Sequence, residues 1–444
     1  MRVCVIGGGL AGAECALKLS DLGVFVDVFE MRPNVSTEAH RTDYFAELVC
    51  SNSFKSVESH TPHGILKKEM SILGSNLLKI AERCRIPGGK ALTVDRCEFS
   101  KAVTELVGHR PNIRVIREEV KNLGQVLDRY DFVCVATGPL TSNSLSEDLK
   151  NRFGEEFLSF YDAASPIVAG DSIKYELGFW GSRYSDQEDY FNIPLDKDMY
   201  YKFVEELRIS SIYEPHLESE KKVRTFNGCR PIEDIAREGV ESLRFSQFSP
   251  KGLKTKAFAV IQLRPENLFN SAFSLVGFQT RLRRQEQEKL LRMLPALSDC
   301  EILRYGFMHR NTYINSPRLL NTNLSFRRDR RIFFAGQITG VEGYVESMAT
   351  GLFTAYVIAS GGHCKPLPNN SMIGSLVHYV SNYRGDDFQP MNANFGLIEV
   401  YMDNQVKDKR QKRIFVGELC IQAITDWLKD YSESSRVYLD LGVC

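Results

Sequence analysis

A glycine-rich turn near the start of the chain has the residue types and spacing needed to bind a diphosphate. An apolar run at residues 2–6 precedes the turn, residues 11–22 have helical spacing, and a second apolar run at 25–29 ends in Glu30. In such a unit the glycines let the backbone approach a pyrophosphate at the helix N-terminus, and the acidic residue accepts hydrogen bonds from a ribose. The candidate cofactor residues are Gly7, Gly8, Gly9, Leu10, Ala11, Gly12 and Glu30.

The position of Glu30 favours an unmodified ribose over a 2′-phosphate, so FAD or NAD is favoured over NADP. S-adenosylmethionine is a weaker option, because it has no pyrophosphate for the helix N-terminus to bind. Residues 130–138 and 331–337 are two further apolar runs that end in turns, and an extended cofactor needs contacts from widely separated segments. Together the three turns favour FAD. The candidate residues in the later turns are Thr137, Gly138, Gly336 and Gln337.

Two of the 11 cysteines have surroundings that could make the thiol reactive. Cys229 precedes Arg230 and Pro231, and the proline predicts a short helix at about 231–238 because it suits the first helical turn. The helix dipole and the neighbouring cation would both favour a thiolate at Cys229, although a buried structural cysteine is the alternative. Cys50 follows a short apolar run and enters a polar turn, and its residues alone leave a reactive and a structural role equally open.

These candidate residues need a scaffold that brings distant segments together. The patterns predict an α/β fold: a Rossmann-like FAD-binding domain of the two-dinucleotide-binding flavoprotein type, interrupted by an inserted α+β substrate domain. We expect the FAD-binding domain at 1–165 and 326–375. The segment 166–325 is rich in aromatic and polar residues and does not alternate between strand and helix patterns, so it is assigned to the insertion. Residues 376–444 are expected to form a basic C-terminal appendage packed on the FAD-binding domain.

The chain has 56 Lys+Arg and 56 Asp+Glu among 444 residues, so its formal charge is zero. This excludes a protein whose whole surface binds nucleic acid, but it allows a local basic patch. Basic residues gather in a predicted helix at 279–293 and again at 407–413. A solvated helix face is the usual explanation of each run alone, but two runs, with arginines at 327–331, favour a polyanionic partner. The candidate RNA contacts are Arg281, Arg284, Lys407, Lys409, Arg410 and Lys412.

The cysteine pattern also limits the compartment and the cofactors. No two cysteines lie three residues apart and their number is odd, which disfavours a zinc ribbon and a disulfide framework, so we expect no metal site. Cys4, Cys15 and Cys134 lie in apolar surroundings and are expected to be inert core residues. No stretch approaches the ~18 apolar residues of a membrane span, and a polar amphipathic segment directly follows the glycine-rich N-terminus. These patterns predict a reduced cytoplasmic enzyme with no membrane partner.

Six segments form a set of motifs across nearly the whole chain: 7–12, 45–53, 228–233, 305–312, 334–344 and 388–397. At these motifs the sequence resembles the folate- and FAD-dependent tRNA (uracil-5-)-methyltransferases. The run Ala46-Glu47-Leu48-Val49-Cys50-Ser51-Asn52-Ser53 is highly specific for that family. Many flavoproteins have an aspartate where Gln337 stands, but this family and its larger tRNA-modifying relatives use glutamine.

The resemblance implies a reaction in which a thiolate adds to C6 of uracil, because C5 is a poor nucleophile until an enolate forms. It assigns that thiolate to Cys229 and places Cys50 on the flavin side of the pocket, near the proton transfers. 5,10-Methylenetetrahydrofolate would supply the carbon, and reduced flavin would carry the methylene and provide a hydride. NADH or NADPH would regenerate the flavin.

The resemblance also implies a folate site and an RNA branch. A histidine stacks on the pterin in this family, and the motif around His309 makes it the first candidate, with His40 second and Tyr344 as a further folate residue. The ribosomal-RNA branch lacks the cysteine at position 50, so Cys50 favours the tRNA branch, whose product is 5-methyluridine in the T-loop. The basic runs would then position tRNA phosphates while the target base is flipped into the pocket.

Other functions and several details stay open at this point. The enzyme alternative is an ordinary FAD oxidoreductase acting on a small substrate, with structural cysteines. The non-enzyme alternative is an RNA-binding flavoprotein that remodels tRNA without methylating it. The sequence decides neither between NADH and NADPH nor between a monomer and a homodimer.

Overall fold

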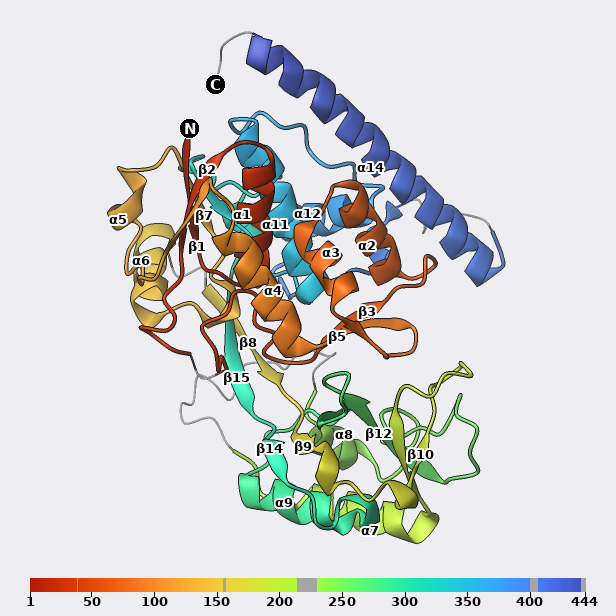
Figure 1. Cartoon of the computed structure of the whole chain (residues 1–444). Helices are drawn as coiled ribbons and strands as arrows, with labels where there is room; N and C mark the ends of the chain where they lie inside the picture. Colours follow the sequence, from red (N-terminus) through yellow and green to blue (C-terminus); the bar gives the residue numbers. More distant parts are fainter. Residues whose placement is uncertain (38, 155–156, 214–229, 400–405, 441–444) are drawn as a thin grey trace.

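A five-stranded parallel sheet forms the centre of the larger part of the molecule. In this computed structural model, which describes residues 1–37, 39–154, 157–213, 230–399 and 406–440, the strand order is β16-β7-β1-β2-β6 (Figure 1). The strands are β1 Arg2–Ile6, β2 Phe25–Phe29, β6 Ile113–Ile116, β7 Phe132–Val135 and β16 Ile332–Phe334. Neighbouring strands in this sheet are all parallel. The α/β class and the two N-terminal strands are confirmed, and the later two strands are shorter than their apolar runs.

Helices on the two sides of the sheet account for its continuous apolar strands. Helices α1 and α11 lie on one side and α5 and α6 on the other (Figure 1). Their bounds are α1 Leu10–Asp21, α5 Gly124–Leu127, α6 Asn143–Phe153 and α11 Tyr344–Ala359. Helices α1 and α11 touch so closely that a Cβ on Gly351 would lie 2.2 Å from the carbonyl oxygen of Ala11. Cys4, Cys15 and Cys134 are buried in this core, as predicted.

A small antiparallel sheet and three helices extend this part towards the insertion. Their bounds are β3 Ser53–Ser56, β4 Arg85–Ile86, β5 Ala91–Val94, α2 Pro62–Ile72, α3 Asn76–Arg83 and α4 Arg96–Gly108. Helix α4 begins sharply because the side chain of Asp95 accepts hydrogen bonds from the backbone N–H groups of Cys97 and Glu98, both at 3.0 Å. This cap fixes Arg96 in the first turn of α4, next to the loop that contains Cys50.

The insertion is an α+β unit with its own core, as predicted. Its antiparallel sheet has the order β10-β11-β12-β13-β9-β14. The strands are β9 Ile167–Ala169, β10 Phe179–Trp180, β11 Phe191–Leu195, β12 Ala259–Pro265, β13 Ala272–Leu275 and β14 Ile302–Arg304. Helices α7 Lys197–Ile209, α8 Ile232–Glu238 and α9 Arg284–Met293 pack on this sheet. The sequence predicts a helix at 279–293, whereas α9 begins later, at Arg284.

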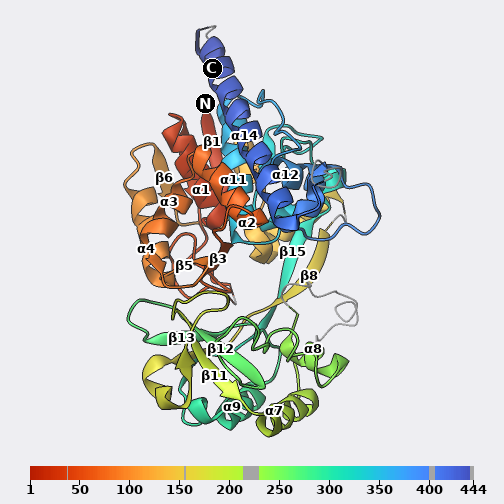
Figure 2. The same cartoon turned by 90° about the vertical axis from the view of Figure 1, so that its right-hand side faces the viewer.

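Two long antiparallel strands connect the insertion to the larger part (Figures 1 and 2). These strands are β8 Phe157–Ala163 and β15 Met308–Ile314, and they pair along their whole length. After β15 the chain returns at once to the larger core, which includes Ile314, Leu320 and Leu324. The sequence-based domain limit at 325 is thus later than the point at which the side chains rejoin that core.

The C-terminal region is only partly an appendage. Helix α12 Met372–Asn382 is largely buried in the larger core, next to the short α10 Ser316–Leu319, although the sequence limit fell inside it at 376. Helix α14 Lys409–Asp440 runs along the outer side of the larger part and packs against α2 (Figures 1 and 2). Among the described residues, none of the helices is long and apolar enough to span a membrane.

Candidate active site

A cavity of about 990 Å³, including its open mouth, lies at the carboxyl ends of β1, β2, β7 and β16. Ligands of doubly wound sheets bind at this edge. Its walls come from the three turns identified in the sequence, and Gly12 lies behind them in the first turns of α1. The predicted residues that line the cavity are Gly7, Gly8, Gly9, Leu10, Ala11, Glu30, His40, Thr137, Gly138, Gly336, Gln337 and Tyr344.

The first turn needs glycine for two different reasons. Gly7 has φ +103°, which residues with a Cβ rarely adopt, and a Cβ on Gly12 would lie 1.9 Å from the carbonyl oxygen of Gly7. Gly9 has φ −74° and a Cβ there would meet no protein atom within 4 Å. Glycine at this third position therefore leaves space in the cavity for a ligand beside the amides at the start of α1.

Glu30 belongs to a ladder of alternating acidic and basic side chains at the cavity wall. Its carboxylate accepts hydrogen bonds from the backbone N–H of Gly8 at 2.8 Å and from Nε of Arg32 at 2.9 Å. Burial by itself would raise the pKa of Glu30, but the hydrogen bonds and the charge of Arg32 outweigh it and lower the pKa. Arg32 also pairs with Glu47 at 3.3 Å, so the ladder connects β2 to the loop that leads to Cys50.

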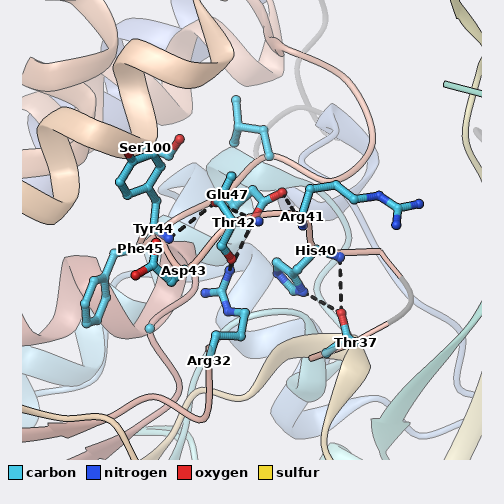
Figure 3. Close-up of polar contacts among 12 residues, drawn as sticks. Arg32, Thr37, His40, Arg41, Thr42, Asp43, Tyr44, Phe45, Glu47 and Ser100 are labelled. Carbon is cyan, nitrogen blue, oxygen red and sulfur yellow. Dashed lines mark hydrogen bonds and ion pairs between the residues drawn. The ribbon is translucent and has the colours of Figure 1, made fainter. Parts of the chain in front are cut away.

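Glu47 orders the loop beside His40. Its carboxylate accepts hydrogen bonds from the backbone N–H groups of Arg41 at 2.8 Å and Thr42 at 3.0 Å (Figure 3). Nδ1 of His40 lies 2.6 Å from Oγ1 of Thr37, which fixes the imidazole at the cavity wall. His40 is thus placed on the same cavity as the glycine-rich turn.

The two later turns complete the cavity with positive-φ glycines. Gly138 has φ +66° and Gly336 has φ +80°. The backbone N–H of Gly336 donates a hydrogen bond to Oγ1 of Thr350 in α11 at 2.8 Å. The side-chain amide of Gln337 donates a hydrogen bond to the carboxylate of Glu342, which holds this turn against the start of α11.

The loop that contains Cys50 lies at one end of this cavity. The neighbouring Val49 lines the cavity, and the backbone N–H of Cys50 donates a hydrogen bond to Oη of Tyr344 at 2.8 Å. Tyr344 is the first residue of α11 and also lines the cavity. The structure therefore brings Cys50 and Tyr344 together beside the predicted cofactor site.

Two further candidates lie wholly or partly outside the described part of the chain. Cys229 and the side chain of His309 lie outside the described residues. The backbone of His309 is opposite Asp162 in the ribbon of β8 and β15. The helix predicted after Cys229 is present as α8 Ile232–Glu238, and Arg230 forms an ion pair with Glu238 at its end.

The basic residues near α9 differ in their surroundings. Arg281 lies before the helix and forms an ion pair with Asp234, with Nε 3.6 Å from Glu233, so part of its charge is neutralised inside the insertion. Arg284 is exposed, and its guanidinium lies 5.3 Å from the ring centroid of Tyr305.

The second basic run begins α14, on the other part of the molecule from α9 (Figures 1 and 2). Lys407, Lys409 and Arg410 are exposed and Lys412 is half-buried. Asp408 caps the start of α14 by accepting a hydrogen bond from the backbone N–H of Gln411 at 2.7 Å, and its carboxylate offsets part of the positive charge of these side chains. The two runs thus form two separate basic areas.

Comparison with known proteins gives a consistent result. The sequence model of the family described as glucose inhibited division protein A matches residues 2–365. The Dictyoglomus turgidum methylenetetrahydrofolate–tRNA-(uracil-5-)-methyltransferase TrmFO is 46% identical over 441 residues, covering 97% of this chain and 99% of that protein. TrmFO from Thermotoga petrophila is 45% identical over 439 residues, covering 97% and 100%. The chain belongs to the TrmFO family.

A solved structure supports the fold of this TrmFO-family chain. GidA of Aquifex aeolicus, in its form II crystal, has a TM-score of 0.69 and 16% identity, covering 97% of this chain and 73% of that chain. Both the family and the fold support FAD as the cofactor. The described residues fit it: the open space beside Gly9 can take a pyrophosphate, and Glu30 lines the cavity after β2, at the position where a ribose binds in such folds.

Several residues of this TrmFO-family site were missed in the sequence. Arg32 and Glu47 extend the ladder from Glu30, while Arg96 and Arg304 donate hydrogen bonds to the carbonyl of Cys50 at 3.2 and 3.1 Å. Glu47 stands inside the family motif, which was a usable signal. Arg96 and Arg304 had none, because their role depends on contacts with residues far away in the sequence.

Proposed function

We propose that this chain methylates C5 of a uridine in the T-loop of tRNA and forms 5-methyluridine. The relatives named TrmFO, at 46% and 45% identity over 97% of the chain, give the reaction class. The observation that carries the proposal in the structure is the position of the Cys50 loop at the end of the dinucleotide cavity. This position would let a thiol exchange protons next to a flavin bound in the cavity.

The residues have distinct roles in this proposal. Cys229 adds to C6 of the uracil, so that the C5 carbon can attack a one-carbon unit. Cys50 moves a proton at the flavin side of the pocket, and Tyr344 holds its loop there. When bound, reduced FAD would supply the hydride and carry the methylene of 5,10-methylenetetrahydrofolate to the uracil. The pterin stacks on His309, with His40 as the second candidate.

The surface residues and the co-substrates complete the proposal. The exposed side chains at the start of α14, together with Arg284, position tRNA phosphates, and Arg281 contributes less because it is paired with Asp234. NADH or NADPH regenerates the flavin. The enzyme works in the cytoplasm, as a monomer or a homodimer.

The direct test measures tritium release from C5-labelled uracil in tRNA, with methylenetetrahydrofolate and NAD(P)H present. We expect a yellow protein that releases tritium, and a Cys229→Ala variant that does not. Release at the wild-type rate by Cys229→Ala would contradict the assigned nucleophile. Cys97→Ala is the matched control, because Cys97 is an exposed cysteine outside the cavity.

A cellular test separates the RNA branches. Mass spectrometry of tRNA from cells that lack the gene should show loss of 5-methyluridine, and the gene should restore it. Unchanged tRNA with altered ribosomal RNA would favour the ribosomal-RNA branch. Salt-sensitive tRNA binding that depends on neither folate nor the cysteines would favour the non-methylating flavoprotein.

A further inference from the structure

Two arginines hold the loop of Cys50 from opposite parts of the molecule. Arg96, at the start of α4, donates hydrogen bonds to the carbonyl oxygens of Leu48 and, at 3.2 Å, Cys50. Arg304, at the end of β14 in the insertion, donates to the carbonyl oxygens of Val49 at 3.3 Å and Cys50 at 3.1 Å. Three successive carbonyl groups therefore point towards two guanidinium groups.

The positive charge of Arg96 and Arg304 exceeds the negative charge of their acidic partner, Glu266. The carboxylate of Glu266, which follows β12, pairs with Arg96 at 2.9 Å and is almost fully buried. Arg264 of β12 also acts on Glu266, whose pKa is lowered because these arginines outweigh its burial. One carboxylate thus faces at least two half-buried cations, and the cluster has a net positive charge.

The groups around Cys50 come from several elements. Electrostatic interactions connect its thiol with Arg96 of α4, Arg304 of β14 and Tyr344 of α11. Glu47 on the same loop pairs with Arg32. Burial, and next the charge of Arg96, lower the pKa of Arg304 to about 10, which still leaves it charged at neutral pH. The positive charge beside the loop is therefore present under working conditions.

We propose that Arg96 and Arg304 form a cationic clamp that positions the Cys50 loop and favours the thiolate of Cys50. Because Arg304 belongs to the insertion, the cysteine on the FAD-binding part acquires its full reactivity only when the insertion is in place. Arg96 and Arg304 are positioning residues, since their contacts are with the loop's carbonyl groups. The clamp rests on the proposed function, in which Cys50 exchanges a proton.

The test measures the alkylation rate of Cys50 against pH in the flavin-bound enzyme, because the thiolate is the reacting form. Iodoacetamide is the probe, peptide mass spectrometry resolves the sites, and the exposed Cys97 is the internal reference. Arg304→Gln should raise the midpoint of the Cys50 profile by about one pH unit or more. Arg304→Lys should raise the midpoint less than Arg304→Gln does, because lysine keeps the positive charge but cannot donate to both carbonyl groups.

A second variant gives a shift of opposite sign. Glu266→Gln removes the carboxylate that neutralises the clamp and should lower the midpoint, whereas general loosening of the loop would move both variants in one direction. Arg244→Gln is the matched control, since Arg244 is a half-buried arginine of the insertion that donates to the carbonyl of Phe258 at 3.3 Å. It should leave the profile unchanged.

The outcomes separate this proposal from the function. An unchanged midpoint in Arg304→Gln, or shifts of the same sign in both variants, would overturn the clamp. If Arg304→Gln does not fold, Glu266→Gln decides, because a lowered midpoint supports the clamp and an unchanged one overturns it. If the Cys50 midpoint differs between the wild type and Arg304→Gln as expected, but the wild type does not methylate tRNA, the proposed function is overturned and the clamp stands.

Discussion

The backbone N–H of Cys50 donates a hydrogen bond to Oη of Tyr344 at 2.8 Å, across 294 residues of sequence. Tyr344 starts the helix that follows the last cofactor turn, and its ring packs 5.8 Å from that of Phe54. One side chain thus joins the third segment of the flavin cavity to the cysteine loop. The position of Cys50 therefore depends on the same helix that completes the cavity.

Tyr344→Phe should impair methyl transfer while the protein still folds. The change leaves the N–H of Cys50 without its acceptor, which should cost about 1–3 kcal/mol of unfolding free energy. Displacement of the cysteine should reduce tritium release by about 10-fold or more. Tyr356→Phe is the control, because Oη of Tyr356 donates to the carbonyl of Leu73 at 2.8 Å, away from Cys50. Equal activity losses in both variants would contradict a specific role for Tyr344.

Gly9→Ala should separate cofactor binding from folding. The added Cβ meets no protein atom within 4 Å, so the melting temperature of the flavin-free protein should hardly change. The methyl group would occupy the space proposed for the pyrophosphate, and FAD affinity should fall by about 10-fold or more. Flavin fluorescence titration measures this. Gly108→Ala, which also meets no atom within 4 Å, should bind FAD normally.

Glu346 should make stability depend on pH in the acid range. Its buried carboxylate lies 3.1 Å from His63 and accepts a hydrogen bond from the N–H of Ala393 at 3.0 Å. Burial would raise its pKa, but His63, Lys55 and the hydrogen bond of Ala393 lower it to about 2. Lys67 of α2 also interacts with Glu346, and burial lowers the pKa of Lys67 to about 8.

The sign of this dependence follows from the lowered pKa. The stabilisation by Glu346 is fully present above the unfolded pKa of about 4.5 and is lost as pH falls towards 2. As pH falls from about 4.5 to 2, the free energy of unfolding of Glu346→Gln should therefore decrease less than that of the wild type. The difference should be on the order of 2–3 kcal/mol. Denaturant midpoints at each pH measure the difference. Parallel curves for the two proteins would contradict the prediction.

The start of α14 should contribute to tRNA affinity through charge. Replacing Lys409 and Arg410 together by alanine should weaken tRNA binding and reduce the slope of log affinity against log salt by about 2. Filter binding at several salt concentrations measures both quantities. Lys365→Ala is the control, because Lys365 pairs with Asp430 near the other end of α14. An unchanged slope would exclude these residues from the RNA interface.

The sequence was most informative where function depends on local backbone geometry. The glycine-rich turn, β1, β2, α1 and α8 could be predicted because each needs particular residues at close spacing. The Arg304–Cys50 contact could not, because an arginine at the end of a short strand has the same local pattern whether it points into solvent or across a domain boundary. The later start of α9 has a similar cause, since Arg281 is held by Asp234 before the helix begins.

Because β8 and β15 are its connection to the larger part, the insertion can change in evolution as a separate unit. Its entry and exit strands lie side by side, and the two hydrophobic cores it connects are separate. Such a unit can be lengthened, replaced or exchanged between flavoproteins without altering the strand order of the cofactor-binding sheet. Selection can therefore change the substrate that reaches the flavin while the machinery that holds the flavin is inherited intact.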